Sequence, residues 1–220
     1  MTERLYNYDA YLSECEARVT DVSEDGVVLN RTVFYPGGGG QPNDTGMLIK
    51  DGRETPVTKV SGKGGLIVHE APHGALDTGD VVTCRIDWDT RHKLMRTHTA
   101  LHILCGVVWR DYGAQVTGGN MSPLKGRMDF EFESLRSELI DEIQRAVNEE
   151  VAADRPVDVD FISREEAENI PDLIRTKINL VPAEVREIRT INIRGLDLQA
   201  DGGTHVRSTG EVGAIRIAGH

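Results

Sequence analysis

The sequence predicts an α+β protein in which a small antiparallel β-barrel precedes a domain of helices packed on an antiparallel sheet. Two observations predict this fold: short β-type segments continue as far as Trp88, and helical periodicity begins at Asp89. The length agrees, because 220 residues lie between one large domain and two small ones. We therefore expect a barrel domain at residues 1–88 and a second, α+β domain at residues 89–220.

The first half of the chain alternates short apolar segments with turn sequences such as Asp25-Gly26 and Gly64-Gly65. Strands of this length between glycine turns are typical of small antiparallel barrels. Pro56 would lie at the edge of a strand, where its missing N–H costs least. The predicted strands are Glu16–Val22, Val27–Asn30, Gly46–Lys50, Val57–Val60, Leu66–Glu70 and Val81–Asp87.

The second half begins with an amphipathic helix of about five turns, capped by Asp89 or Thr90. Its stripe, spaced alternately by three and four residues, is Met95, His98, His102, Cys105 and Trp109. The later elements are a strand at Gly126–Glu133, a helix over Leu135–Val151 with Ser134 as N-cap, a strand at Val157–Ile162, a short helix opened by a Ser163/Glu166 capping box, and strands at Val185–Ile193 and Gly213–Ala218.

Composition restricts the class of protein. The chain is 39% hydrophobic and 28% charged, its first ten residues have no apolar core of a signal peptide, and no apolar run is long enough for a membrane span. Three cysteines without CxxC spacing argue against a disulfide scaffold or a four-cysteine zinc site. We expect a cytoplasmic protein without a membrane partner, and its oligomeric state is not predicted.

The net charge of −11 disfavours non-specific nucleic-acid binding, because phosphate contacts require Lys and Arg. Positive charge is nevertheless concentrated in two regions. One holds Arg85, Arg91, Lys93 and Arg96, and the other runs from Arg175 to Arg194. Each is predicted equally well as an ordinary solvated face.

His98 and His102 are four residues apart on the first predicted helix, so their side chains lie about 6 Å apart on one face and can converge on a metal. Two hydrogen-bonded core histidines explain the same spacing about as well. A metalloprotease is disfavoured, because Thr99 stands where that class has its glutamate base.

The segment Asp201-Gly202-Gly203-Thr204-His205 offers a carboxylate and an imidazole on a loop that glycine can bend. Taken alone, it is explained equally well as a glycine turn with an incidental histidine. Together with His98 and His102 it makes a set of four metal ligands, and this combination favours a metal site.

A glycine run lies in Phe34-Tyr35-Pro36-Gly37-Gly38-Gly39-Gly40-Gln41-Pro42. It is no P-loop, because the Lys-Ser/Thr pair and the following helix are missing. Its backbone N–H groups can approach a ligand closely, with Gln41 positioned to hydrogen bond. On its own residues alone, a flexible hairpin loop is the better interpretation.

These three motifs, in this order, resemble the editing domain of alanyl-tRNA synthetase and above all its free-standing relatives, the alanyl-tRNA editing proteins. The resemblance covers nearly the whole chain. It implies that zinc is held by two helical histidines and by a Cys-Gly-Gly-Thr-His loop, which correspond here to His98, His102, Asp201 and His205. Asp201 stands where cysteine is expected, so other divalent metals are tolerated better. Cys105 is an alternative thiolate donor, although a buried apolar role suits it better.

The resemblance further implies hydrolysis, in trans, of the ester that joins serine, or glycine, to alanine-specific tRNA. Gln41 and Thr204 are the candidates for hydrogen bonding the substrate, and no side chain is predicted as the general base. The metal either activates water or orients and polarises the ester. Two alternatives remain: a tRNA-binding module without catalysis, and a metal-dependent hydrolase of a small ester or amide.

Overall fold

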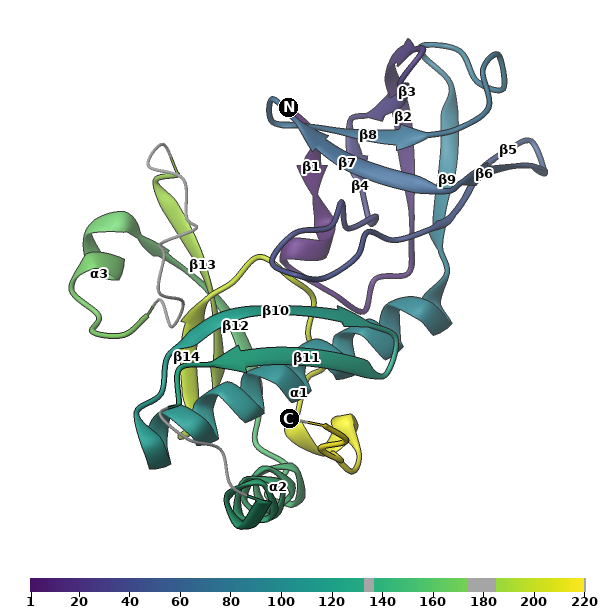
Figure 1. The fold of residues 1–220 in the computed structure, drawn as a ribbon. Coiled ribbons are helices and arrows are strands. Elements are labelled where there is room, and N and C mark those ends of the chain that lie inside the picture. Colours follow the sequence, from purple (N-terminus) through teal and green to yellow (C-terminus); the bar gives the residue numbers. More distant parts are fainter. Residues whose placement is uncertain (133–136, 174–184, 220) are drawn as a thin grey trace. The chain divides into compact units, whose positions relative to one another are not determined.

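The computed structural model describes residues 1–132, 137–173 and 185–219, and it consists of two compact units, Met1–Leu94 and Met95–His220. Figure 1 shows the elements of both units along the chain. Helix α1 (Trp88–Tyr112) begins in the first unit and continues into the second. No described helix is long and apolar enough to cross a membrane.

The first unit is built on a seven-stranded antiparallel sheet with the order β6-β5-β9-β2-β3-β8-β7. A short parallel pair, β1 with β4, and the 3-10 helix η1 (Leu5–Asn7) complete it. The strands are β1 (Glu3–Arg4), β2 (Glu14–Ser23), β3 (Gly26–Leu29), β4 (Arg31–Thr32), β5 (Gly46–Lys50), β6 (Arg53–Val57), β7 (Lys59–Lys63), β8 (Leu66–Glu70) and β9 (Val81–Ile86).

The α+β class and the large antiparallel sheet are confirmed, but the closed barrel is not found. Within the fully described first unit, no backbone ladder joins the edge strands β6 and β7. The predicted strand Val57–Val60 is also wrong, because Val57 ends β6 and β7 begins after Thr58. Residues three apart on a straight strand face opposite sides, yet Val57 and Val60 are both buried. The interruption of the strand at Thr58 allows both to reach the core.

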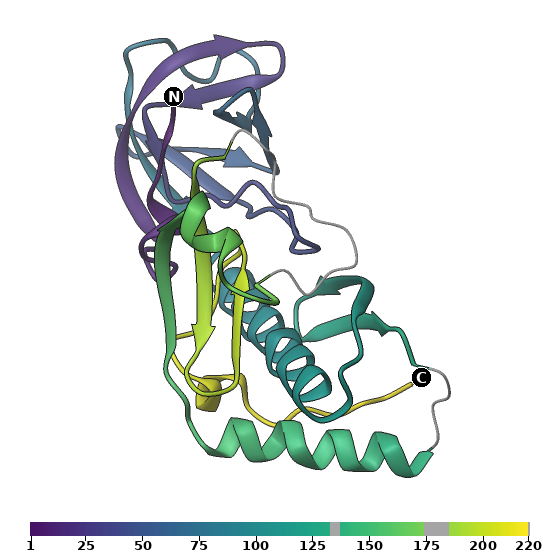
Figure 2. The ribbon, with the colours of Figure 1, turned by 90° about the vertical axis from the view of Figure 1, so that its left-hand side faces the viewer.

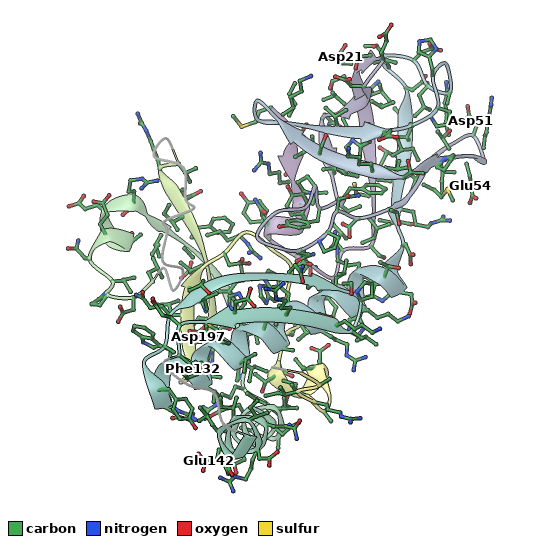
Figure 3. All side chains as sticks on the ribbon, viewed as in Figure 1. Asp21, Asp51, Glu54, Phe132, Glu142 and Asp197 are labelled. Atoms are coloured by element: carbon green, nitrogen blue, oxygen red, sulfur yellow. The ribbon has the colours of Figure 1, made fainter. Side chains whose placement is uncertain are left out.

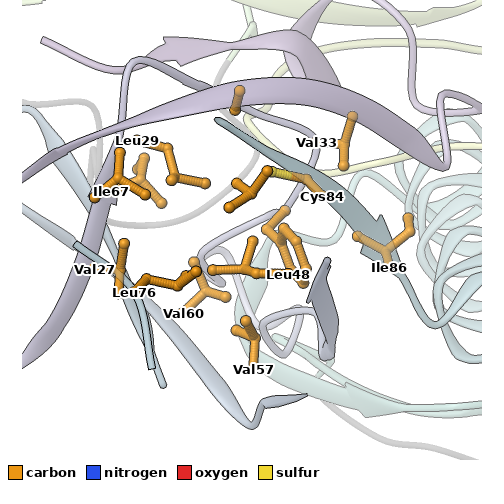
Figure 4. Packing of buried hydrophobic residues seen from close by; sticks show 14 residues of the cluster. Val27, Leu29, Val33, Leu48, Val57, Val60, Ile67, Leu76, Cys84 and Ile86 are labelled. Carbon is orange, nitrogen blue, oxygen red and sulfur yellow. The ribbon is translucent and has the colours of Figure 1, made fainter. Parts of the chain in front are cut away.

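The core of the first unit lies on one face of this sheet (Figure 4). Leu48 on β5 and Ile67 on β8 are both fully buried in the same apolar cluster, although their strands are far apart in the sheet order. The sheet must therefore curve around the cluster. Each of these side chains contributes about 2 kcal/mol through burial alone.

In the second unit, α1 lies between a β-hairpin and a three-stranded antiparallel sheet (Figures 1 and 2). Gly126 in the hairpin allows close contact with Leu101, because a Cβ there would lie 2.9 Å from a Leu101 methyl. The elements are β10 (Val116–Ser122), β11 (Lys125–Phe130), α2 (Ser137–Ala152), β12 (Val157–Ser163), α3 (Arg164–Glu168), β13 (Glu187–Ile193), β14 (Asp197–Ala200) and the 3-10 helix η2 (Thr209–Val212).

Several local predictions for this unit are confirmed, and others are incomplete. Helix α1 is longer than five turns, at 25 residues. The capping box of Ser163 and Glu166 opens α3 as predicted. Strands β10 and β14 were not predicted; Gly118-Gly119-Asn120 interrupts the apolar alternation of β10. The proposed N-cap Ser134, with Glu133 and Leu135, lies outside the described residues.

The predicted strand Gly213–Ala218 is wrong, because this segment forms no backbone ladder with any strand in the part of the chain that the structure describes. Side-chain amides of α2 bind its backbone instead. Asn148 Oδ1 accepts from Ile215 N at 2.9 Å, and Asn148 Nδ2 donates to Ile215 O at 2.8 Å. Gln144 Oε1 accepts from Ile217 N at 2.8 Å. The hydrogen-bonding partner of this segment is therefore a helix and not a strand.

Candidate metal centre

Two sequence-distant segments of the second unit meet at a cluster of His98, His102, Asp201 and His205. The first two lie on α1 and the others in the loop after β14. Each residue offers one potential ligand atom, and all four atoms lie within 4.8 Å of one another. The fold thus brings together the whole ligand set that the sequence indicates.

The spacing of these atoms suits a divalent metal. Asp201 Oδ2 lies 3.1 Å from His205 Nε2, and Asp201 Oδ1 lies 3.6 Å from His98 Nε2. Nitrogen and oxygen ligands bind zinc at about 2.0–2.2 Å, which places neighbouring donors of a tetrahedral site about 3.3 Å apart. Three imidazoles and one carboxylate are also a chemically suitable donor set for zinc and for harder divalent ions.

Polar groups lie behind two of the imidazole rings of the cluster. Thr99 Oγ1 lies 3.1 Å from His205 Nδ1 and accepts a hydrogen bond from the Val206 amide at 3.3 Å. Asp197 Oδ2 lies 3.5 Å from His102 Nδ1. Since these contacts involve the Nδ1 atoms, the Nε2 atoms of both rings are left for the cluster. Such outer groups usually select the ring tautomer of a metal ligand.

The loop that carries Asp201 is fixed to strand β13 at both of its backbone groups. Asp201 N donates to Arg189 O at 3.1 Å, and the Arg189 guanidinium donates to Asp201 O at 2.9 Å. The Asp201 side chain closes the turn that follows, because its Oδ2 accepts from Gly203 N at 2.6 Å. The carboxylate is therefore held in place by the protein itself.

Burial controls protonation in the cluster. It lowers the pKa of His98 to about 4 and that of His205 well below its usual range, so both rings are neutral near pH 7. Burial by itself would raise the pKa of Asp201, but the surrounding imidazoles outweigh this effect and hold the pKa well below normal. For His102, burial is outweighed by Asp197 and Asp201, which raise the pKa. Neutral imidazoles and an ionised carboxylate are the forms that bind metals.

The two residues predicted to bind substrate are placed differently. Thr204 lies between two cluster residues in sequence and is fully buried. Gln41 belongs to the first unit, is 2% exposed, and pairs its backbone with Gly38 through hydrogen bonds of 2.9 and 3.0 Å. Cys105 is outside the cluster: its sulfur accepts a hydrogen bond from Gln199 Nε2 at 3.3 Å.

Sequence reasoning missed Thr99, Arg189 and Asp197. Thr99 was noted only as a departure from the protease pattern, although its place between two helical histidines was a usable signal. Nothing in the spacing of Arg189 or Asp197 indicated a role, because both come from strands that reach the cluster only through the tertiary fold.

The first predicted basic region is not a free phosphate-binding face. Arg91 is fully buried, where Nε donates to Asp44 at 2.9 Å. Lys93 lies 2.5 Å from Asp89, and Arg85 pairs with Glu14 at 3.0 Å. Arg96 donates to the carbonyl of Val212. Much of the second region falls at 174–184, outside the described residues.

Comparison with known proteins identifies two matching family models and several similar chains. The family model for tRNA synthetases class II (A) matches residues 9–90, and that for the threonyl and alanyl tRNA synthetase second additional domain matches residues 188–219. The alanyl-tRNA editing protein AlaX-M of Saccharolobus solfataricus is 41% identical, over 98% of this chain and 91% of that protein. Its namesake from Methanosarcina barkeri is 40% identical, over 99% and 92%.

The alanine–tRNA ligase of Pyrococcus furiosus is also 40% identical, over 98% of this chain but only 24% of the ligase. The match with the editing proteins extends over nearly the full length of both partners, and it includes the segments that form the histidine and aspartate cluster. The chain belongs to the alanyl-tRNA editing protein family.

Proposed function

We propose that this protein is an aminoacyl-tRNA deacylase that removes serine, or glycine, from mischarged alanine-specific tRNA in trans. The observation that carries the proposal is the buried cluster of His98, His102, Asp201 and His205, in a chain that matches alanyl-tRNA editing proteins along almost its whole length. Its partner is therefore tRNA, and its proposed cofactor is a divalent metal, zinc in the first place.

In the reaction, water attacks the carbonyl carbon of the aminoacyl ester and the bond to the ribose oxygen breaks. The products are the free amino acid and a tRNA with a free terminal hydroxyl. A divalent ion would supply Lewis-acid chemistry, which activates water or orients and polarises the ester.

The residues of the chain prepare this site before substrate arrives. His98 and His205 are kept neutral by burial, and Asp201 contributes the negative charge that partly balances a divalent ion. Thr99 orients the His205 ring, and Arg189 holds the backbone of Asp201. Such preorganisation avoids the cost of arranging ligands during the reaction.

We assign substrate binding to Thr204 and Gln41. In this assignment, residues 89–220 form the deacylase domain, and the glycine-rich loop with Gln41 belongs to the domain of residues 1–88. Polar groups of this kind suit selection of serine. A site that hydrogen bonds the serine hydroxyl rejects alanine by about 10⁴-fold, because alanine leaves buried polar groups without a partner.

The decisive experiment measures deacylation of seryl-tRNA and alanyl-tRNA side by side, with and without a chelator. We expect rapid loss of serine, slow loss of alanine, and loss of activity when the metal is removed and its return when zinc is added. His98→Ala should lose both metal and activity, whereas Asp158→Asn, on an exposed part of β12, should retain both.

Two other outcomes would each replace the proposal. Binding of tRNA without any hydrolysis would identify a non-catalytic tRNA-binding module. Metal-dependent hydrolysis of small esters or amides, with no preference for aminoacyl-tRNA, would identify a different hydrolase. Full deacylase activity in protein shown to be metal-free would refute the metal dependence.

A further inference from the structure

Asp197, the first residue of β14, places a second buried carboxylate behind the cluster. Its side chain is fully buried in the second unit, and Figure 3 labels it. Its Oδ2 lies 3.5 Å from His102 Nδ1 and accepts a hydrogen bond from Gln199 Nε2 at 2.6 Å. Gln199 lies two residues along the same strand, so both side chains are on the face of β14 that meets α1.

His102 needs a partner on this side. Its Nδ1 atom is buried, and among the described residues it makes no hydrogen bond within the usual geometric limits. A buried ring N–H without an acceptor costs about 1–3 kcal/mol. The Asp197 carboxylate is at the edge of hydrogen-bonding distance, so a shift of a few tenths of an ångström in the ring would complete the bond.

A glycine in α1 allows this approach. Gly106 lies one turn after His102, and a Cβ at this position would be 2.9 Å from Asp197 Cβ and 3.0 Å from Leu196 Cγ. Glycine inside a helix costs about 1 kcal/mol relative to alanine. Here it allows β14 to approach α1 closely enough for the carboxylate to reach His102.

We propose that Asp197 is a positioning residue for the metal centre. It accepts the Nδ1 proton of His102 and thereby fixes the tautomer whose Nε2 is free to bind a metal, while Gln199 holds the carboxylate in place. The inference rests on the proposed function only in taking His102 as a ligand. The proposed hydrogen bond between Asp197 and the His102 imidazole is expected in the metal-free protein as well.

Zinc affinity tests the consequence for the metal. It is measured by competition with a chromogenic chelator for the wild type, Asp197→Asn and the matched charge-loss control Asp158→Asn. Asp197→Asn keeps the shape of the side chain but removes its charge, and we expect about 10- to 100-fold weaker binding. Asp158→Asn should bind as the wild type does, because Asp158 pairs with Arg194 on an exposed face.

Gly106→Ala provides a second variant that leaves every polar group in place. It should weaken zinc binding in the same direction, because the added methyl displaces Asp197 from His102. Unfolding curves of the metal-free variants establish that each one is folded. Wild-type zinc affinity in folded Asp197→Asn would overturn the proposal.

The tautomer of His102 tests directly whether Asp197 positions the imidazole, and its measurement requires neither metal nor activity. Nitrogen NMR shifts of metal-free protein at alkaline pH should show the Nδ1–H form of His102 in the wild type and loss of this preference in Asp197→Asn. An unchanged tautomer would overturn the proposal. If the wild type shows this tautomer but binds no zinc, the metal-dependent function fails while the positioning of His102 by Asp197 stands.

Discussion

At the residue scale, the two carboxylate oxygens of Asp201 make separate contacts, whereas a cysteine at this position would offer only one sulfur atom. Its Oδ1 faces His98 at 3.6 Å, while its Oδ2 faces His205 at 3.1 Å and accepts from the Gly203 amide at 2.6 Å. One carboxylate therefore closes the loop and faces the cluster. A thiolate has no second oxygen with which to divide these contacts.

This division leads to a prediction for two substitutions. Asp201→Ala should lose metal, because it removes a ligand and the bond to Gly203. Asp201→Cys should retain a metal and prefer zinc over harder ions, since thiolate is the softer donor. Metal content and deacylation are measured for both variants. An alanine variant that keeps its metal but not turnover would identify Asp201 as a base instead, and one with normal metal and activity would remove it from the site.

At the element scale, the sequence did not show which element binds the last segment of the chain. Gly213–Ala218 was predicted as a strand from its sequence, and in the structure Ile215 and Ile217 are half-buried while Arg216 and Ala218 are exposed. Asn148 and Gln144 of α2 supply the hydrogen bonds that another strand would have supplied. Periodicity reports which side of a segment is buried, and it does not report what covers that side.

The contact between α2 and the last segment gives a prediction. Asn148→Leu removes the donor and the acceptor that pair with Ile215, and it should lower the free energy of unfolding by about 1–3 kcal/mol. Hydrogen exchange at the Ile215 amide should become faster. Glu149→Ala, on the exposed side of the same helix, is the control. It should change the free energy of unfolding by no more than about 0.5 kcal/mol and leave the exchange rate of the Ile215 amide unchanged. Unchanged exchange in Asn148→Leu would show that the segment is held by other contacts.

At the scale of the whole molecule, the proposed function requires a chain of net charge −11 to bind tRNA. Acidic side chains such as Asp21, Asp51 and Glu54 lie on the surface of the first unit (Figure 3). The basic residues around α1 are largely engaged: Arg91 is buried against Asp44, and Lys93 pairs with Asp89. Few cations are left there for phosphate groups.

We therefore predict that tRNA affinity falls only shallowly with salt. The slope of log affinity against log salt concentration is about −0.9 per phosphate contact on duplex nucleic acid, so a few contacts give a slope of about −2 to −4. Filter binding or fluorescence titration over a range of salt concentrations measures it. A much steeper slope would mean that a basic surface forms elsewhere. Arg91 should not be used to test the surface, because removing it leaves Asp44 buried without its partner and costs about 3–5 kcal/mol.

The sequence by itself determined the α+β class, most strands of the first unit, helix α1, the capping box of α3 and the family. These depend on periodicity, turn chemistry and short motifs, which act over a few residues. It also named His98, His102, Asp201 and His205, because i, i+4 spacing and a glycine loop are local signals. Their assignment as metal ligands remains a prediction until metal is measured.

Only the tertiary structure decided which groups stand behind that set and how the sheet of the first unit ends. Asp197 and Arg189 reach the cluster because β13 and β14 pack beside α1, and Gly106 permits the approach. Arg91 is an internal ion-pair partner rather than a phosphate ligand because of Asp44, which is 47 residues away in sequence. Such contacts depend on long-range packing and desolvation, and neither leaves a repeating pattern in the sequence.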